Sequence, residues 1–149
     1  MAKTKLLPEY KILEWYPPFL FMGVKIKSVS SDYRKLHAQL PLRWYGKNLH
    51  GTMFGGFMAA ASDPIASLLC GKIFPGLEVW AQNHCIDFLR PGQGTLDLKV
   101  EVTDSDVAQI REALKTQGKV SHVFEFYFTD HSGGKIARVR NTVYLRVNR

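Results

Sequence analysis

The spacing of hydrophobic positions changes several times along the chain, and each spacing predicts one kind of element. In residues 8–22 the spacing is near-helical, which predicts a short helix disturbed towards its end by Pro17 and Pro18. From residue 24 the pattern alternates, first over 24–29 and then over 33–42, which predicts two strands joined by a tight connection. Residues 43–53 follow neither period, so we expect a loop there.

The stretch 54–72 stands apart because almost every residue in it is apolar. We expect a helix that is buried on all sides rather than amphipathic. A proline inside a continuous helix costs about 3 kcal/mol, so Pro64 predicts a break near Ser62. From local chemistry, Asp63 would then be the N-cap of the second piece and Pro64 its first residue.

The remaining residues predict four strands and one surface helix. A strand over 77–89 is closed by Arg90-Pro91-Gly92, and alternation predicts another over 95–103. A helix follows near 105–117, with Asp104 or Ser105 as its N-cap and Gly118 at its end. Residues 119–130 and 135–147 then form a hairpin around a glycine-containing turn.

This order of elements predicts an α+β fold. One antiparallel sheet of six strands would wrap around the apolar helix, because the strands need a cover and the helix needs burial. That arrangement is a hotdog fold, here with an N-terminal helix and an extra surface helix. The 149 residues suit a single domain over 1–149, and 46% hydrophobic with 22% charged residues is a globular composition.

The net charge of +7 raises nucleic acids, anionic lipids and phosphate-bearing ligands as partners. The basic residues are spread along the chain without a run of five, which favours a small phosphate-bearing molecule over nucleic acid. Alternation in the last strand places Arg138, Arg140 and Arg146 on one face. This face is either an ordinary solvated surface or a strip that attracts phosphate.

The cysteines and the apolar runs indicate in which cellular compartment the protein is expected. Cys70 and Cys85 lie in apolar stretches without metal-binding spacing, so we expect buried, reduced thiols and no metal site. The first residues lack the apolar core of a signal peptide, and the apolar run before Asp63 is too short to span a bilayer. We therefore expect a cytoplasmic protein with no membrane span.

Two glycines and one acid give the apolar helix a possible chemistry. The first amides of a helix have no partner within it, so those of Gly55 and Gly56 could polarise a carbonyl. Asp63 follows Gly55 by eight residues, roughly 12 Å along the axis. One carbonyl cannot touch both groups on one helix. We therefore expect a homodimer in which Gly56 of one subunit faces Asp63 of the other.

Further polar residues flank this helix. Asn48 could orient a water or a thioester, or could simply be a turn residue. His50 could assist, or could pack at the helix entrance. Asp63 would act as general base towards water or as nucleophile. His84 and Cys85 sit in mid-strand as one polar and one buried position.

Two stretches in this order resemble the hotdog-fold acyl-CoA thioesterases of the phenylacetate-degradation, PaaI-like, type. Those enzymes carry Asn, five residues, His-Gly-Gly, six residues and a catalytic Asp. Asn48, Phe54-Gly55-Gly56 and Asp63 have the same spacing here. The segment "CIDFLRPGQG" is similar to the family's strand and turn. The resemblance covers roughly residues 20–147 and points to a less characterised, thioesterase-like branch.

The resemblance implies a homodimer, or a homotetramer built from it, that hydrolyses the thioester of coenzyme A or an acyl carrier. Coenzyme A is then part of the substrate, and no separate cofactor is implied. Asp63 takes the catalytic position, the Gly56 and Gly55 amides hold the carbonyl, and Asn48 positions the site. The candidate substrate-binding residues are His50, Phe54, His84, Arg90, Gly92, Arg138 and Arg140.

Three departures from the family pattern keep alternatives open. Phe54 stands where the family has histidine, Pro64 follows the acid, and the helix near 105–117 separates strands that a hairpin usually joins. Phe54 motivates a second hypothesis, a non-catalytic protein that binds acyl-CoA or fatty-acyl groups. A hotdog dehydratase or hydratase and a nucleic-acid-binding protein complete the alternatives.

Overall fold

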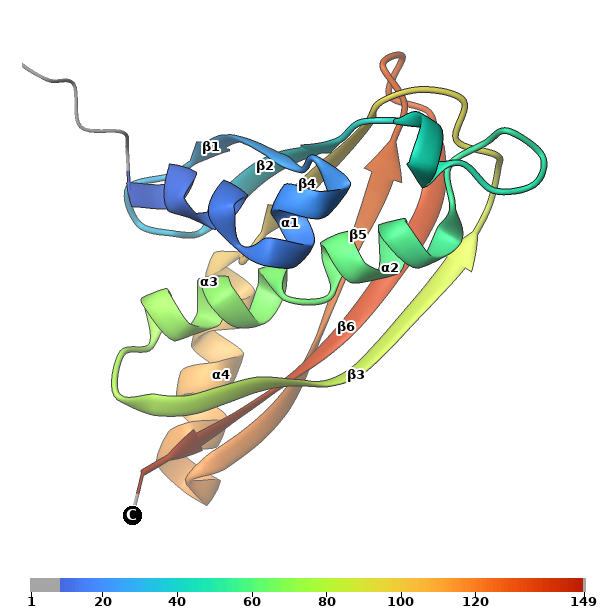
Figure 1. Ribbon diagram of the computed structural model, residues 1–149. Coiled ribbons are helices and arrows are strands. Elements are labelled where there is room, and N and C mark those ends of the chain that lie inside the picture. Colours follow the sequence, from blue (N-terminus) through green and yellow to red (C-terminus); the bar gives the residue numbers. More distant parts are fainter. Residues whose placement is uncertain (1–8, 149) are drawn as a thin grey trace, which may run out of the picture.

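The computed structural model describes residues 9–148 (Figure 1). Its helices and strands are η1 (Glu9–Trp15), α1 (Pro17–Met22), β1 (Lys25–Val29), β2 (Lys35–Leu40), η2 (Trp44–Gly46), α2 (Gly55–Ser62), α3 (Ile65–Ile73), β3 (Leu77–Phe88), β4 (Leu96–Glu101), α4 (Asp104–Gln117), β5 (Lys119–Thr129) and β6 (Lys135–Val147). Elements η1 and η2 are 3₁₀ helices, and the others are α-helices and strands.

The six strands form one antiparallel sheet in the order β1-β2-β4-β5-β6-β3. The sheet curves, and α2 and α3 lie end to end in its hollow (Figure 1). This is the predicted hotdog fold with its six-stranded sheet. The two halves of the sheet are joined narrowly, because β4 pairs with β5 only through 97–99 and 127–129.

The alternating strands bury one side chain in two, as the sequence pattern predicts. Inward positions supply most of the core: Ile26, Leu36, Ala38, Leu40, Leu96, Leu98, Val100, Phe124, Phe126, Phe128, Val139, Val143 and Leu145. The helices contribute Met58, Ile65 and Leu69 from the other side. Burying each large side chain stabilises the fold by about 1.5–3 kcal/mol, so the sheet and the central helices hold each other in place.

The expectation of one helix over 8–22 is wrong in detail. Residue 8 lies outside the described residues, and the rest forms a 3₁₀ helix followed by a separate α-helix. Pro17 and Pro18 begin α1 rather than disturb a helix end. The reason is that a first-turn residue needs no amide donor and proline's fixed φ suits the helix. Gly23, at φ 74°, then ends α1 in the left-handed conformation.

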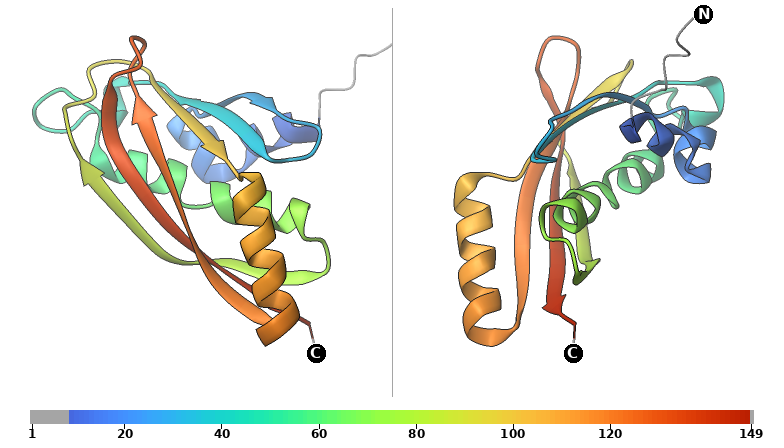
Figure 2. Two further views of the ribbon diagram at one scale, coloured as in Figure 1. Left: turned by 180° about the vertical axis from the view of Figure 1, so that it is seen from behind. Right: turned by 90° about the vertical axis from the view of Figure 1, so that its left-hand side faces the viewer.

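The surface helix is present as α4, with a different N-cap. Thr103, not Asp104 or Ser105, caps it: the Thr103 hydroxyl accepts from the Asp106 amide, and the Asp106 carboxylate accepts from the Thr103 amide. Gly118 ends the helix as expected. The helix runs beside β5 where β4 and β5 diverge (Figure 2), and His122 contacts the Asp106 carboxylate at 2.8 Å.

The apolar stretch 54–72 is divided, as predicted, into α2 and α3 at Asp63-Pro64. Burial on all sides is wrong for the single chain. Met58 and Ile65 face the sheet and are buried, whereas Gly56, Ala60 and Asp63 on the other side are exposed. One curved sheet covers only one side of a helix, so the other side stays exposed in the single chain. The apolar composition of the helix does not show which side that is.

The two cysteines differ from each other. Cys70 is buried in α3, and burial raises the pKa of its thiol to about 12. Cys85 is exposed, so the expected burial of both thiols is wrong. Alternation along β3 explains the difference, because His84 takes the inward position and its neighbour must point outward.

Candidate active site at the two ends of α2

The N-terminal end of α2 is held by two loops. The Phe54 amide donates to the Gly46 carbonyl at 2.8 Å, and the Met53 amide donates to the Gly92 carbonyl at 2.8 Å. The Gly55 and Gly56 amides have no hydrogen-bond partner among residues 9–148. They are therefore available to a ligand oxygen, as the sequence predicts for the first turn of a helix.

A cavity of about 510 Å³ opens at the head of α2, beside Gly55. It is lined by Asn48, His50, Thr52, Met53, Phe54, Gly55, Met58, Phe88, Leu89, Arg90, Pro91 and Gly92. Six of the residues chosen from the sequence thus meet at one place, although they come from two segments of the chain, 48–58 and 88–92. Mostly apolar walls with a few polar groups are typical of small-molecule sites.

Asn48 is engaged in its own turn. Its side-chain oxygen accepts from the amides of His50 at 2.9 Å and Thr52 at 3.1 Å, and its nitrogen donates to the Thr52 hydroxyl at 2.9 Å. This geometry fits the turn-residue alternative. One amide hydrogen of Asn48 remains for a ligand, while the His50 side chain is exposed at the cavity rim.

Two aromatic rings lie close to the two glycines at the head of α2. A Cβ atom on Gly55 would lie 2.7 Å from the Phe88 ring, and one on Gly56 would collide with the Phe54 ring. The Phe54 ring, at the position where the PaaI-like pattern has histidine, therefore lies over Gly56. It supplies an apolar cover next to the free amides rather than a polar contact.

Asp63 lies at the opposite end of α2. It is exposed, and its carboxylate makes no hydrogen bond or ion pair with the residues that the structure describes. The expectation that it caps α3 is wrong: Asp63 keeps helical φ and ψ and donates its amide to Ala59, and Pro64 takes the N-cap position. An N-cap needs an extended backbone to fold its side chain over the next turn, and here the backbone stays helical.

A buried polar cluster beneath Asp63 was missed from the sequence. Asn141 is fully buried on the inward face of β6. Its side-chain nitrogen, Nδ2, lies 3.0 Å from the Asp63 carbonyl oxygen and 2.8 Å from His84 Nδ1. His84 Nε2 lies 3.1 Å from the Ser62 hydroxyl, which donates to the Met58 carbonyl at 2.7 Å. The sequence feature that could have revealed this cluster is Asn141 itself, a polar residue between Val139 and Val143 at an inward-facing strand position.

The partners fix every proton in this cluster. A carbonyl oxygen only accepts, so the Asn141 atom facing Asp63 must be the nitrogen, and His84 Nδ1 must accept from it. The neutral imidazole then carries its hydrogen on Nε2 and donates to Ser62. Burial lowers the pKa of His84, although the nearby charge of Asp63 acts in the opposite direction. Because its pKa is lowered, the imidazole is neutral near pH 7.

This arrangement is not a serine nucleophile with its base. Ser62 is fully buried, its proton is given to a backbone carbonyl, and His84 donates to it rather than accepting from it. His84 is also not free to act at the carbon of a bound substrate, as a dehydratase or hydratase would require. The cluster instead satisfies the Asp63 carbonyl at the helix break and holds that segment in place.

The three arginines are not gathered at the cavity. Arg90 lines it and donates to the Lys135 carbonyl at 3.1 Å. Arg138 and Arg140 lie on the outward face of β6, where both donate to Asp87, at 2.8 Å and 3.4 Å. The hydrogen bond from Arg138 holds the pKa of Asp87 below its usual value. These two charges are thus partly neutralised in the single chain.

Two other features of residues 9–148 bear on function. They contain no group of three or more histidine, cysteine or acidic side chains placed to hold a metal ion. Among them, too, no helix has the length and apolar character needed to cross a membrane.

Comparisons with known proteins agree with the fold. Residues 9–145 match the model of a family described as a domain of unknown function, DUF4442. A probable thioesterase of unknown function from Pseudomonas aeruginosa has 18% identity and a TM-score of 0.83, covering 95% of this chain and 97% of that one. No curated protein matches the sequence.

Two further solved structures are similar. The PaaI protein from the phenylacetic acid degradation operon of E. coli has 21% identity and a TM-score of 0.69, covering 93% of this chain and 90% of its own. A thioesterase from Haemophilus influenzae has 16% identity and a TM-score of 0.72, covering 96% of this chain and 92% of its own. At these identities the similarity establishes the hotdog fold.

Proposed function

The chain belongs to the family described as DUF4442, a domain of unknown function, and we propose that this member is an acyl-CoA thioesterase that acts as a homodimer. The observation that carries the proposal is the pair of unused groups on the central helices. The Gly55 and Gly56 amides and the Asp63 carboxylate are all without partners among residues 9–148. They are the two groups that thioester hydrolysis needs, and the solved structures named above include thioesterases.

The proposed chemistry divides the work between the two ends of α2. The amides of Gly55 and Gly56 hold the thioester carbonyl and stabilise the oxyanion that forms. Asp63 takes a proton from a water molecule whose oxygen bonds to the carbonyl carbon. When the tetrahedral intermediate collapses, the carbon–sulfur bond breaks and the departing thiolate receives the proton held by Asp63. In direct attack, the carboxylate oxygen would bond to the carbonyl carbon and the carbon–sulfur bond would break, which gives a mixed anhydride and a thiolate. Water would then open the anhydride to the free acid and protonated Asp63, and the Asp63 proton would pass to the thiolate.

A second copy of the chain is part of this proposal. The amides and the acid are roughly 12 Å apart on one helix, so each site would take its acid from the other subunit. Two features of the single chain support a close isologous contact. Strand β3 ends the sheet and leaves one edge unpaired, and the exposed side of α2 is made of small residues such as Gly56 and Ala60.

Coenzyme A would enter through the cavity at the head of α2. Arg90 is the candidate for its phosphates, because it lines this cavity beside Gly92. Arg138 and Arg140 remain candidates in the dimer only, where the partner could bring phosphate to the outward face of β6.

Asp63→Asn tests the proposal directly. We expect kcat to fall at least about 100-fold, because the amide cannot accept a proton, while the circular dichroism spectrum and the size-exclusion volume stay unchanged. The assay follows thiol release from a panel of acyl-CoA esters. Glu112→Gln, which neutralises an exposed acid on α4, is the matched control. Wild-type turnover by Asp63→Asn would remove the acid from the mechanism.

Phe54 supports one alternative, a protein that binds acyl-CoA or fatty-acyl groups without hydrolysing them. Its ring covers Gly56 where the family pattern has a polar histidine. Titration calorimetry with acyl-CoA separates the two functions. Tight binding with no thiol release over hours would favour the binding protein. Phe54→His, which restores the family residue, would then be expected to give measurable hydrolysis.

A further inference from the structure

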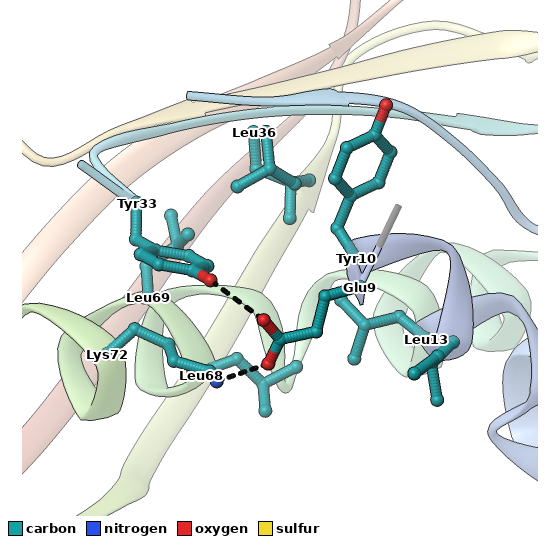
Figure 3. A pocket seen from close by; sticks show the side chains of 10 residues that line it. Glu9, Tyr10, Leu13, Tyr33, Leu36, Leu68, Leu69 and Lys72 are labelled. Atoms are coloured by element: carbon teal, nitrogen blue, oxygen red, sulfur yellow. Dashed lines mark hydrogen bonds and ion pairs between the residues drawn. The ribbon is translucent and has the colours of Figure 1, made fainter. Parts of the chain in front are cut away.

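An apolar groove runs along α3 away from Asp63. Its first part is lined by Ile12, Leu13, Trp15, Tyr16, Pro64 and Leu68. Its second part shares Ile12, Leu13 and Leu68 and continues over Tyr10, Val29, Tyr33, Leu36 and Leu69 (Figure 3). One wall is therefore η1, and the other is formed by Pro64, the N-cap of α3, with Leu68 and Lys72 of α3 following at intervals of about one turn.

Polar groups lie at the far end of this groove. Lys72 Nζ donates to Glu9 Oε1 at 3.1 Å, and the Tyr33 hydroxyl lies 3.5 Å from Glu9 Oε2 (Figure 3). From Pro64 to Lys72 the helix rises about 12 Å, and the inner part encloses about 210 Å³. Between the two ends the walls carry almost only carbon, which an ionic or strongly polar ligand could not satisfy.

Large apolar side chains stay exposed at the near end. Ile12 is 64% exposed, Trp15 67% and Leu68 40%. Covering apolar surface is worth about 25 cal/mol per Å², and a contiguous apolar patch on a soluble chain commonly marks a binding surface. Ile12 and Leu68 also border the inner cavity, so one ligand could cover the patch and fill the cavity together.

We propose that this groove binds the unbranched alkyl chain of the acyl group, so that the preferred substrates are medium-chain aliphatic acyl thioesters. The inference rests on the proposed function, because the groove begins at Pro64, directly beside the acid. An acyl carbonyl at Asp63 would send its chain along α3 of the same subunit. The chain would end beneath the Glu9–Lys72 pair, which sets the length that fits.

The affinity of the protein for acyl-CoA esters of different chain length tests the groove independently of turnover. Acetyl-CoA and decanoyl-CoA are titrated into full-length Asp63→Asn by calorimetry, so that hydrolysis does not interfere. We expect decanoyl-CoA to bind at least tenfold more tightly than acetyl-CoA. Adding Leu68→Trp, which fills the groove from an exposed position, is expected to lower that ratio at least tenfold. Leu49→Trp, at a fully exposed loop position away from the groove, should leave the ratio as it was.

Two further variants make the result decisive. Ile12→Glu places a charge in the same groove from the other wall, so it should lower the ratio even if Leu68→Trp misfolds. Lys72→Ala opens the far end and should shift the preferred chain to a longer acyl group. Equal affinity for the two esters, or a ratio that neither groove variant changes, overturns the groove proposal. Absence of hydrolysis in the wild type, with the affinity ratio intact, overturns the thioesterase and leaves the groove.

Discussion

Asn141→Leu tests whether the buried polar cluster holds the helix break together. The substitution keeps the volume and removes both hydrogen bonds that Asn141 donates, to the Asp63 carbonyl and to His84 Nδ1. Each buried group left without a partner costs about 1–3 kcal/mol. The Asn141 side-chain oxygen is itself buried without a partner among the described residues, so its removal returns part of that cost. We expect a net loss of about 2 kcal/mol.

Urea unfolding followed by circular dichroism measures this difference. With an m-value of about 2 kcal/mol per M, the midpoint should fall by about 1 M. Thr142→Val, on the outward face of the same strand, is the control and should stay within about 0.5 kcal/mol of the wild type. Asn141→Asp should be less stable than Asn141→Leu, because neither side chain donates to the Asp63 carbonyl but the carboxylate also buries a charge and sets an acceptor against that carbonyl. A leucine variant as stable as the wild type would refute the reasoning.

Three other predictions address separate features. Because burial lowers the pKa of folded His84, the unfolded chain binds more protons below about pH 6.5, so stability should be complete above that pH and decline as pH falls. Urea midpoints at pH 7.5 and 5.5 should therefore drop more for the wild type than for His84→Gln, and equal drops would contradict the assignment. Thr103→Ala should lower the free energy of unfolding by about 1 kcal/mol, because it removes the N-cap of α4; an unchanged thermal midpoint would count against the capping box. Gly55→Ala should weaken acyl-CoA binding in calorimetry by displacing the Phe88 ring, whereas Gly94→Ala, with open space around it, should not.

Most of the fold could be predicted because its signals are local. Alternation located the strands, and Gly118 marked the end of α4. The errors in residues 8–22 have a different cause. Pro17 and Pro18 are equally compatible with the end of one helix and the start of another, and only the path of the chain over the sheet decides which.

The candidate site was predicted in its parts but not in its connections. Spacing brought out Asn48, Gly55 and Asp63, and the structure places Asn48 and Gly55 at one cavity with Asp63 at the other end of the helix. The spacing left open whether Asn48 is a turn residue or a site residue, and it wrongly indicated that Asp63 caps α3. Both outcomes depend on backbone angles at single residues, which hydrophobic periodicity does not encode.

The sequence by itself determined where the six strands and the central and surface helices lie, where the central helix breaks, and which of its amides lack a partner, because periodicity, proline and glycine act over a few residues. Only the tertiary structure decided what surrounds Asp63. Asn141 reaches its carbonyl from 78 residues away, and the groove along α3 needs η1 as its second wall. Such contacts follow from how a curved sheet packs on a helix, and packing is a property of the whole chain.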